Sequence, residues 1–146
     1  MLKLLRSNLA SVNDELISYK LAVDFLSKIT HLGWVGVYFY NPVTEEFYLG
    51  YNVGSSPKST VVKYNQLAFP RNQYDASYTV NNEVHQDHPS SLSPGAGSEA
   101  QILIKSNGKI LAMICVGSSE RGTFDDDDRD SLRELGRLVA EQVTLR

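Results

Sequence analysis

The sequence contains a single cysteine, Cys115, among its 146 residues. One cysteine excludes a disulfide within the chain, a zinc site built from several cysteines, and a redox relay between two thiols. It is consistent with a reducing compartment, so we expect a cytoplasmic protein. No apolar run approaches the roughly 18 residues of a membrane-spanning helix, so we expect no membrane partner.

The sequence also lacks an excess of positive charge. Lysine and arginine total 14 against 17 aspartates and glutamates, which gives a net charge of -3. This balance and the absence of a basic–aromatic patch argue against a nucleic-acid partner. There is no glycine-rich phosphate loop and no recognisable Ser-His-Asp spacing, so we expect no cofactor. The length and the 42% hydrophobic content predict one domain spanning residues 1–146.

The first thirty residues predict one long helix with an apolar stripe at alternating steps of three and four. The stripe consists of Leu2, Leu5, Leu9, Val12, Leu16, Tyr19, Val23 and Leu26. A second apolar row, formed by Ile17, Leu21, Phe25 and Ile29, lies beside its later half. Two interpretations stay open: a wide helix that faces its own core, or a helix-pairing seam that makes a homodimer.

Aromatic and β-branched runs predict strands after this helix. We expect them at residues 34–40, 46–51, 60–64, 100–104 and 109–116. Asn107-Gly108 predicts a tight hairpin, and the run after it is apolar on both faces, which indicates a central strand. Residues 65–97 show no sustained period and predict a binding loop, a lid or a disordered insertion. A last helix is expected at 125–143.

This order predicts an α+β fold with a central, largely antiparallel sheet of five to six strands. We expect the terminal helices to pack together on one face of the sheet. The long loop and a ligand cavity are expected on the other face.

Four motifs, in this order, resemble a GAF domain. They are Trp34-Val35-Gly36-Val37-Tyr38, Ser98-Glu99 at a strand entrance, Cys115-Val116-Gly117-Ser118-Ser119, and Gly122-Thr123-Phe124-Asp125 with three further aspartates. The resemblance is closest to the free methionine-(R)-sulfoxide reductase type and covers the chain from about Leu26 to Val143. It implies a GAF-like (profilin-like) fold with a small-molecule pocket.

The chain differs from that family at the residues that carry the family's redox chemistry. The places of the redox cysteines are taken by Ser59, Phe69 and Ser93, and two aspartates of the strand 114–118 are missing. Sulfoxide reduction requires a thiolate to attack sulfur and a second thiol to resolve the sulfenic acid, which serine cannot replace. Of the family's ligand-facing positions, Trp34, Tyr38 and Glu99 are kept.

Seven residues are predicted to bind a ligand: Trp34, Tyr38, Tyr51, Glu83, His85, Glu99 and Cys115. Glu83-Val84-His85 echoes a loop segment of the family, and tyrosines such as Tyr51 can line a small-molecule cavity. The place of Cys115 matches a ligand-facing acid, although a thiol in an apolar strand is usually inert.

Two clusters look like metal sites but favour simpler interpretations. His85 and His88, with acids between them, are interpreted as a loop and not as a zinc site. Asp125 to Asp128 lack the pattern of a calcium loop and are interpreted as the acidic first turn of a helix. No metal is therefore expected.

The favoured hypothesis is a non-catalytic, sensory domain that binds a small molecule and forms a homodimer. One alternative is a methionine-(R)-sulfoxide reductase that uses Cys115 and an external thiol. Another is a purely structural interaction module.

Overall fold

The computed structural model describes residues 5, 9, 15–29, 32–54, 56–67, 69, 78–84 and 91–144. Two long helices and six strands make up most of this part of the chain. In chain order the elements are α2 (Glu15–Ser27), β1 (Trp34–Asn41), β2 (Glu46–Val53), β3 (Val61–Lys63), the 3-10 turn η1 (Tyr64–Gln66), β4 (Tyr78–Asn81), β5 (Ser98–Ser106), β6 (Lys109–Ser118) and α3 (Asp126–Thr144).

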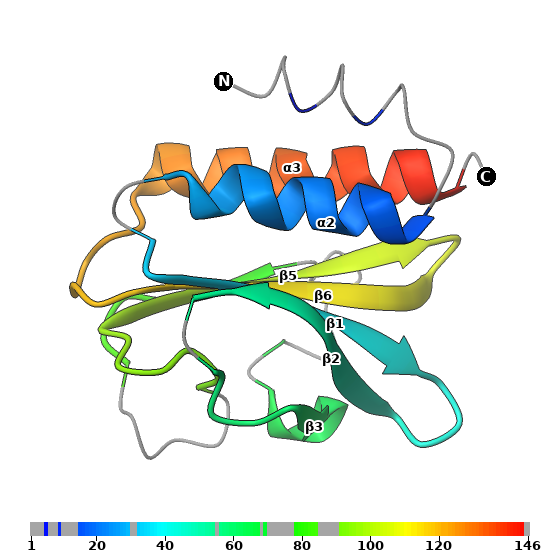
Figure 1. The fold of residues 1–146 in the computed structure, drawn as a ribbon, viewed down its shortest axis with the longest axis horizontal. Helices are drawn as coiled ribbons and strands as arrows, with labels where there is room; N and C mark the ends of the chain where they lie inside the picture. The colour runs from blue at the N-terminus through cyan, green and yellow to red at the C-terminus, as the bar shows by residue number, and fades with distance from the viewer. Residues whose placement is uncertain are drawn as a thin grey trace.

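All six strands form one antiparallel sheet in the order β3-β2-β1-β6-β5-β4 (Figure 1). The sheet confirms the predicted α+β fold. The β5–β6 hairpin turns at Asn107 and Gly108, whose φ angles of 52° and 77° lie in the left-handed region that this dipeptide tolerates. The strand that follows the turn is central, as predicted, and residues 112–118 are buried.

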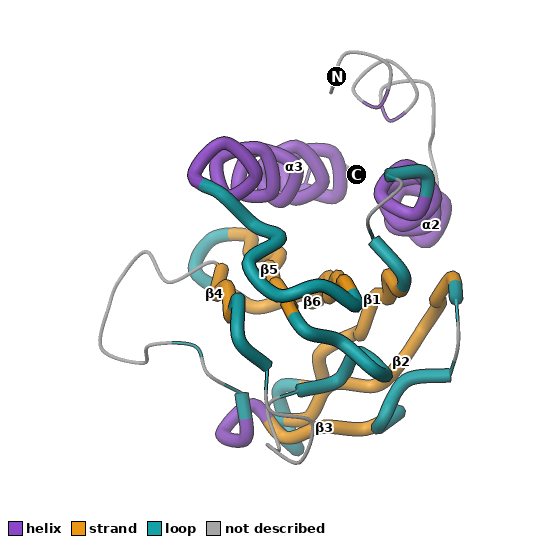
Figure 2. The backbone as a smooth tube through the Cα atoms, turned by 90° about the vertical axis from the view of Figure 1, so that its left-hand side faces the viewer, coloured by secondary structure: helices purple, strands orange, loops and turns teal. Residues whose placement is uncertain are grey.

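Both helices cover the same face of the sheet, and the loops gather on the other (Figures 1 and 2). We call the second face the helix-free face. A large apolar cluster fills the space between helices and sheet, and a smaller one covers the helix-free face. The predicted arrangement of terminal helices on one face is confirmed. In the described residues, no helix has the length and apolar character to cross a membrane.

The acidic run at residues 125–128 forms the start of α3, as predicted. The Asp128 amide donates to Asp125 Oδ1 at 2.8 Å, and the Asp125 amide donates to Asp128 Oδ2 at 3.1 Å. This reciprocal pair satisfies donors that a helix start leaves open, and the negative charges favour the positive end of the helix dipole.

The apolar stripe of the first helix packs against the core of this chain. Five of its six described members are buried in the large cluster: Leu5, Leu9, Tyr19, Val23 and Leu26. Leu16 is 45% exposed. The core-facing interpretation therefore accounts for most of the stripe, and the homodimer stays a prediction. The helix expected from residue 1 to 30 is described as α2 over Glu15–Ser27, with Leu5 and Leu9 the described residues before it.

One local prediction was wrong, and β2 carries an irregularity that no prediction addressed. The stretch 65–97, expected to be free of regular structure, contains β4, which pairs with β5 through four residues only. In β2 a bulge lies at Gly50, because Tyr38 pairs with Leu49 whereas its neighbour Val37 pairs with Tyr51. The extra residue interrupts the alternation of side chains along the strand. Leu49 consequently packs with the helix-free cluster and Tyr51 packs on the helix side.

Candidate functional site

The helix-free face carries most of the residues predicted to bind a ligand. Alternation along β1 turns Trp34 and Tyr38 to this face, and Val35 and Val37 to the helices. Strands β5 and β6 add polar groups at the same end of the sheet, because Glu99 pairs with Gly117 in the ladder. The sheet thus brings residues from three strands together.

Glu99 is a carboxylate buried to 4% exposure. Five groups of this chain donate hydrogen bonds to it. The donors and their shortest distances are Gln101 Nε2 (2.6 Å), the Leu92 amide (3.1 Å), Ser91 Oγ (3.2 Å), the Ser93 amide (3.2 Å) and Cys115 Sγ (3.4 Å). A buried carboxylate is tolerated only when its oxygens are satisfied in this way.

Three of these donors belong to residues 91–93, which we call the strap. The strap runs across the helix-free face, and Leu92 is buried in the cluster with Trp34 and Tyr38. A Cβ added at Gly117 would overlap the side chain of Ser93. The strap therefore approaches β6 as closely as it does because residue 117 has no side chain.

The aromatic wall beside Glu99 consists of Trp34 and Tyr38, whose ring centroids are 6.5 Å apart. The Tyr38 hydroxyl donates to the Ser59 carbonyl at 2.6 Å. Burial, with smaller contributions from Cys115 and Glu99, raises the pKa of Tyr38 above its usual range, so it stays a neutral donor. The buried Trp34 indole nitrogen has no hydrogen-bond acceptor among the described residues.

Cys115 is fully buried on β6. Burial, together with the nearby charge of Glu99, raises the pKa of its thiol well above the ordinary value. The Ser93 hydroxyl lies 3.6 Å from its sulfur. A protonated, enclosed thiol is a poor nucleophile, which agrees with the interpretation of Cys115 as an inert strand residue.

Of the other three predicted residues, the two that the structure describes, Tyr51 and Glu83, do not join this cluster. The Tyr51 hydroxyl donates to Asp24 Oδ1 of α2 at 2.7 Å, on the opposite face of the sheet. Glu83 is exposed in the turn after β4. His85 lies outside the described residues.

Sequence reasoning missed the strap and Gln101. Gln101 follows Glu99 by two residues on β5, so alternation places both on the same face. Two polar residues on one face in the buried part of a strand are a signal that the sequence did contain. The strap forms no regular element, and its one signal was the family resemblance, which puts the place of a redox cysteine at Ser93.

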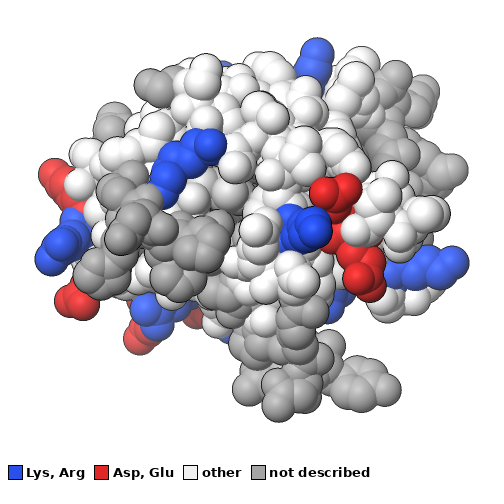
Figure 3. Space-filling model, turned by 90° about the horizontal axis from the view of Figure 1, so that it is seen from below, with Lys and Arg blue, Asp and Glu red and all other residues white. Residues whose placement is uncertain are grey.

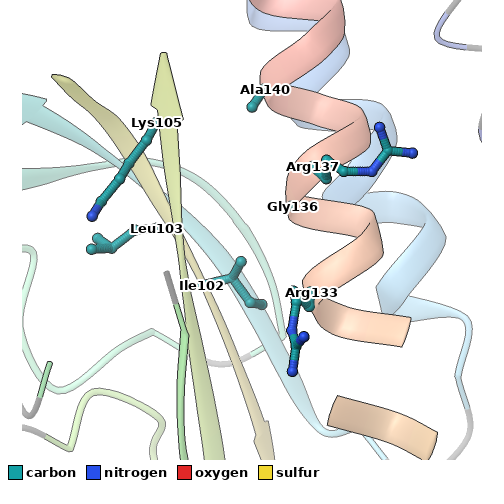
Figure 4. Close-up of a pocket in the computed structure, with 7 residues that line it drawn as sticks. All are labelled: Ile102, Leu103, Lys105, Arg133, Gly136, Arg137 and Ala140. Atoms are coloured by element: carbon teal, nitrogen blue, oxygen red, sulfur yellow. The ribbon is translucent and has the colours of Figure 1, made fainter. Parts of the chain in front are cut away.

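Two further features of the described surface offer no competing site. A hollow of about 300 Å³ lies between β5 and α3 (Figure 4). Of the three cations that line it, Arg133 and Arg137 already pair with acids of their own helix, and the third is Lys105 of β5. The view from below shows the helix-free face itself, whose described surface is mostly uncharged with scattered charges (Figure 3). No group of three or more metal-binding side chains occurs in the described residues.

Solved structures identify this architecture. A GAF domain of the phosphoenolpyruvate-protein phosphotransferase from Acinetobacter superposes with a TM-score of 0.80, covering 99% of this chain and 90% of that one at 11% identity. The chain has a GAF-like fold. No family model matches the sequence, and no curated protein matches it.

Other GAF-like neighbours are reductases. The free methionine-R-sulfoxide reductase of Neisseria meningitidis, solved in complex with its substrate, superposes with a TM-score of 0.82 over 96% of this chain and 84% of that one, at 20% identity. The type II enzyme of Thermoplasma acidophilum superposes with a TM-score of 0.73, covering 97% of this chain and 96% of that one at 18% identity. At these identities the likeness shows the GAF-like fold that the sequence motifs predicted, and it does not distinguish a reductase from a binding domain.

Proposed function

We propose that this GAF-like chain binds a small molecule on its helix-free face and performs no redox chemistry on it. The observation that carries the proposal is the buried Glu99 carboxylate beside the aromatic wall of Trp34 and Tyr38. Charged groups are seldom buried unless they are paired. A few convergent polar groups in an apolar setting are typical of ligand sites.

The chemistry of these groups favours an amino acid as the ligand. Glu99 is suited to an ammonium or amide donor, and the Trp34 indole can donate to an oxygen of the ligand. The surrounding rings suit an apolar body. The substrate of the similar Neisseria enzyme is, by that enzyme's name, free methionine-R-sulfoxide, which is itself an amino acid. We therefore propose free apolar amino acids and their sulfoxides as the ligand class.

The state of Cys115 supports binding without reduction. A thiolate that attacks the sulfoxide sulfur releases methionine and becomes a sulfenic acid, which a second thiol must then reduce. The sequence has no second cysteine. The one that it has is buried, with a raised pKa.

The proposal is tested by thermal unfolding in the presence of L-leucine, L-methionine and methionine-R-sulfoxide. A ligand at a hundred times its Kd stabilises the native state by about 2.7 kcal/mol, which corresponds to about 5–10 °C in a chain of this size. Glu99→Gln removes the charge from the proposed ligand site and should abolish the ligand-induced rise in Tm. Glu120→Gln, an exposed change at the same end of the sheet, is the matched control and should keep it.

Two results would contradict the proposal. The first is the absence of any rise in the wild-type Tm with the whole panel, which would favour a structural role. The second is thiol-dependent turnover of methionine-R-sulfoxide that disappears in Cys115→Ser, which would favour the reductase.

A further inference from the structure

We call the space around Glu99, Trp34 and Tyr38 the ligand seat. We propose that the strap is an internal occupant of this seat, so that a ligand binds only by displacing residues 91–93. Leu92 holds the place of the ligand's apolar side chain, and the donors of the strap hold the place of its ammonium group. This inference rests on the proposed function and adds a self-inhibiting contact to it.

Leu92 supplies both features that the seat would recognise in an amino acid. Its side chain is 1% exposed and packs in the cluster that contains Trp34 and Tyr38. Its backbone amide lies 3.1 Å and 3.2 Å from the two oxygens of Glu99. One residue therefore places an N–H donor on the carboxylate and a branched apolar group against the aromatic wall.

The neighbours of Leu92 complete an ammonium-like set of donors. The Ser93 amide and the Ser91 hydroxyl each lie 3.2 Å from Glu99 Oε2. Three donors from three consecutive residues thus converge on one carboxylate. An ammonium group also carries three N–H donors, so a bound amino acid can replace the strap one bond for one bond.

This exchange makes displacement possible at low cost. Each hydrogen bond to the buried charge contributes about 1.5–3 kcal/mol, and losing it without replacement would be prohibitive. A ligand that supplies the same number of bonds leaves Glu99 satisfied throughout. The strap belongs to no described helix or strand, so its movement breaks no ladder of the sheet. It does break the hydrogen bond that the Lys58 amide donates to the Leu92 carbonyl at 3.0 Å.

The strap contacts β6 at small residues. The Ser93 side chain lies where a side chain on Gly117 would lie, and its hydroxyl is 3.6 Å from the Cys115 sulfur. The sequence resemblance places the missing aspartates on this strand. The strap therefore fills space on the strand that larger acidic side chains would need.

The test measures binding of L-leucine by calorimetry to the wild type, Leu92→Ala and Ser91→Ala. Leu92→Ala removes the apolar side chain of the strap, so this variant should bind L-leucine at least tenfold more tightly than the wild type does. Ser91→Ala removes one strap bond but leaves the apolar contacts in place, and should bind about three- to tenfold more tightly. Leu138→Ala, a truncation of a buried residue in the helix-side cluster, is the control and should bind as the wild type does.

N-acetyl-L-leucine separates a ligand seat from a simple cavity. It has the same side chain but no ammonium group, so it should bind Leu92→Ala at least tenfold more weakly than L-leucine. Equal binding of the two compounds would show that the truncation merely made an apolar cavity, and would overturn the inference.

The outcomes distinguish this inference from the proposed function. If the wild type and both strap variants bind L-leucine equally, the strap does not compete and the inference is wrong, although the proposed function stands. If only the strap variants bind, the strap is an occupant and the native chain is not a receptor for this ligand. If no form binds, both statements fail.

Discussion

The close approach of the strap to β6 allows a quantitative test at Gly117. A Cβ at this position would overlap Ser93 Cβ and Oγ, and would lie 3.6 Å from Ala96 Cβ. Ser93 is fully buried, so it cannot move into solvent without taking the strap with it. Gly117→Ala should therefore destabilise the protein, even though alanine suits a β-strand better than glycine does.

The expected loss has two parts. Forcing an additional carbon into a packed site costs about 1–3 kcal/mol. If the strap moves to make room, the hydrogen bond of the Ser93 amide to Glu99 weakens, which adds about 1 kcal/mol. A total near 3 kcal/mol corresponds to a fall in Tm of about 6–12 °C for a chain of this length.

Urea and thermal unfolding of four variants would test this reasoning. Gly33→Ala is the matched control, because a Cβ there meets nothing within 4 Å, and its stability should change by less than about 0.5 kcal/mol. Ser93→Gly in the Gly117→Ala background should recover about 1–2 kcal/mol, whereas Ser93→Gly alone should be mildly destabilising. If Gly117→Ala is as stable as Gly33→Ala, or if Ser93→Gly brings no recovery, the strap is not seated on residue 117.

Three further changes test other contacts. In Gly50→Ala the added Cβ would overlap the Phe39 ring at the bulge, so urea unfolding should show a loss of about 1–3 kcal/mol. Burial raises the pKa of Cys115 well above 9.0, so the unfolded chain loses its thiol proton first as pH rises. The free energy of unfolding should therefore fall as the pH rises above about 9, and Cys115→Ala should reduce this decline. Tyr51→Phe removes the hydrogen bond to Asp24 and should cost about 0.5–1.5 kcal/mol, measured in the same way.

Strong local signals made most of the fold predictable. Asn107-Gly108 between two apolar runs has few alternatives to a hairpin, and a run that is apolar on both faces must be covered on both sides. The short strand β4 escaped prediction because its four residues are too few to show a period, and it exists through its pairing with β5.

The site was predictable where strand alternation applies and not elsewhere. Trp34 and Tyr38 share a face because nothing interrupts their alternation along β1. Tyr51 lies on the helix side because the bulge at Gly50 reverses the alternation of side chains along β2, and a bulge depends on pairing between strands. The position of the strap could not be predicted, since it depends on the fit of Ser93 against Gly117, which lies on β6 and is distant in the sequence.

The division of the interior into two clusters has a consequence for local opening. The helix-side cluster joins α2 and α3 to the sheet, whereas the helix-free cluster includes loop residues such as Leu92 and Phe69. Loop residues can leave the sheet while the helices stay packed, so subglobal unfolding of one side need not spread to the other. Amide hydrogen exchange should accordingly separate into two classes, with the amides of the strap exchanging by a low-energy opening and those of β1 and β6 only by global unfolding.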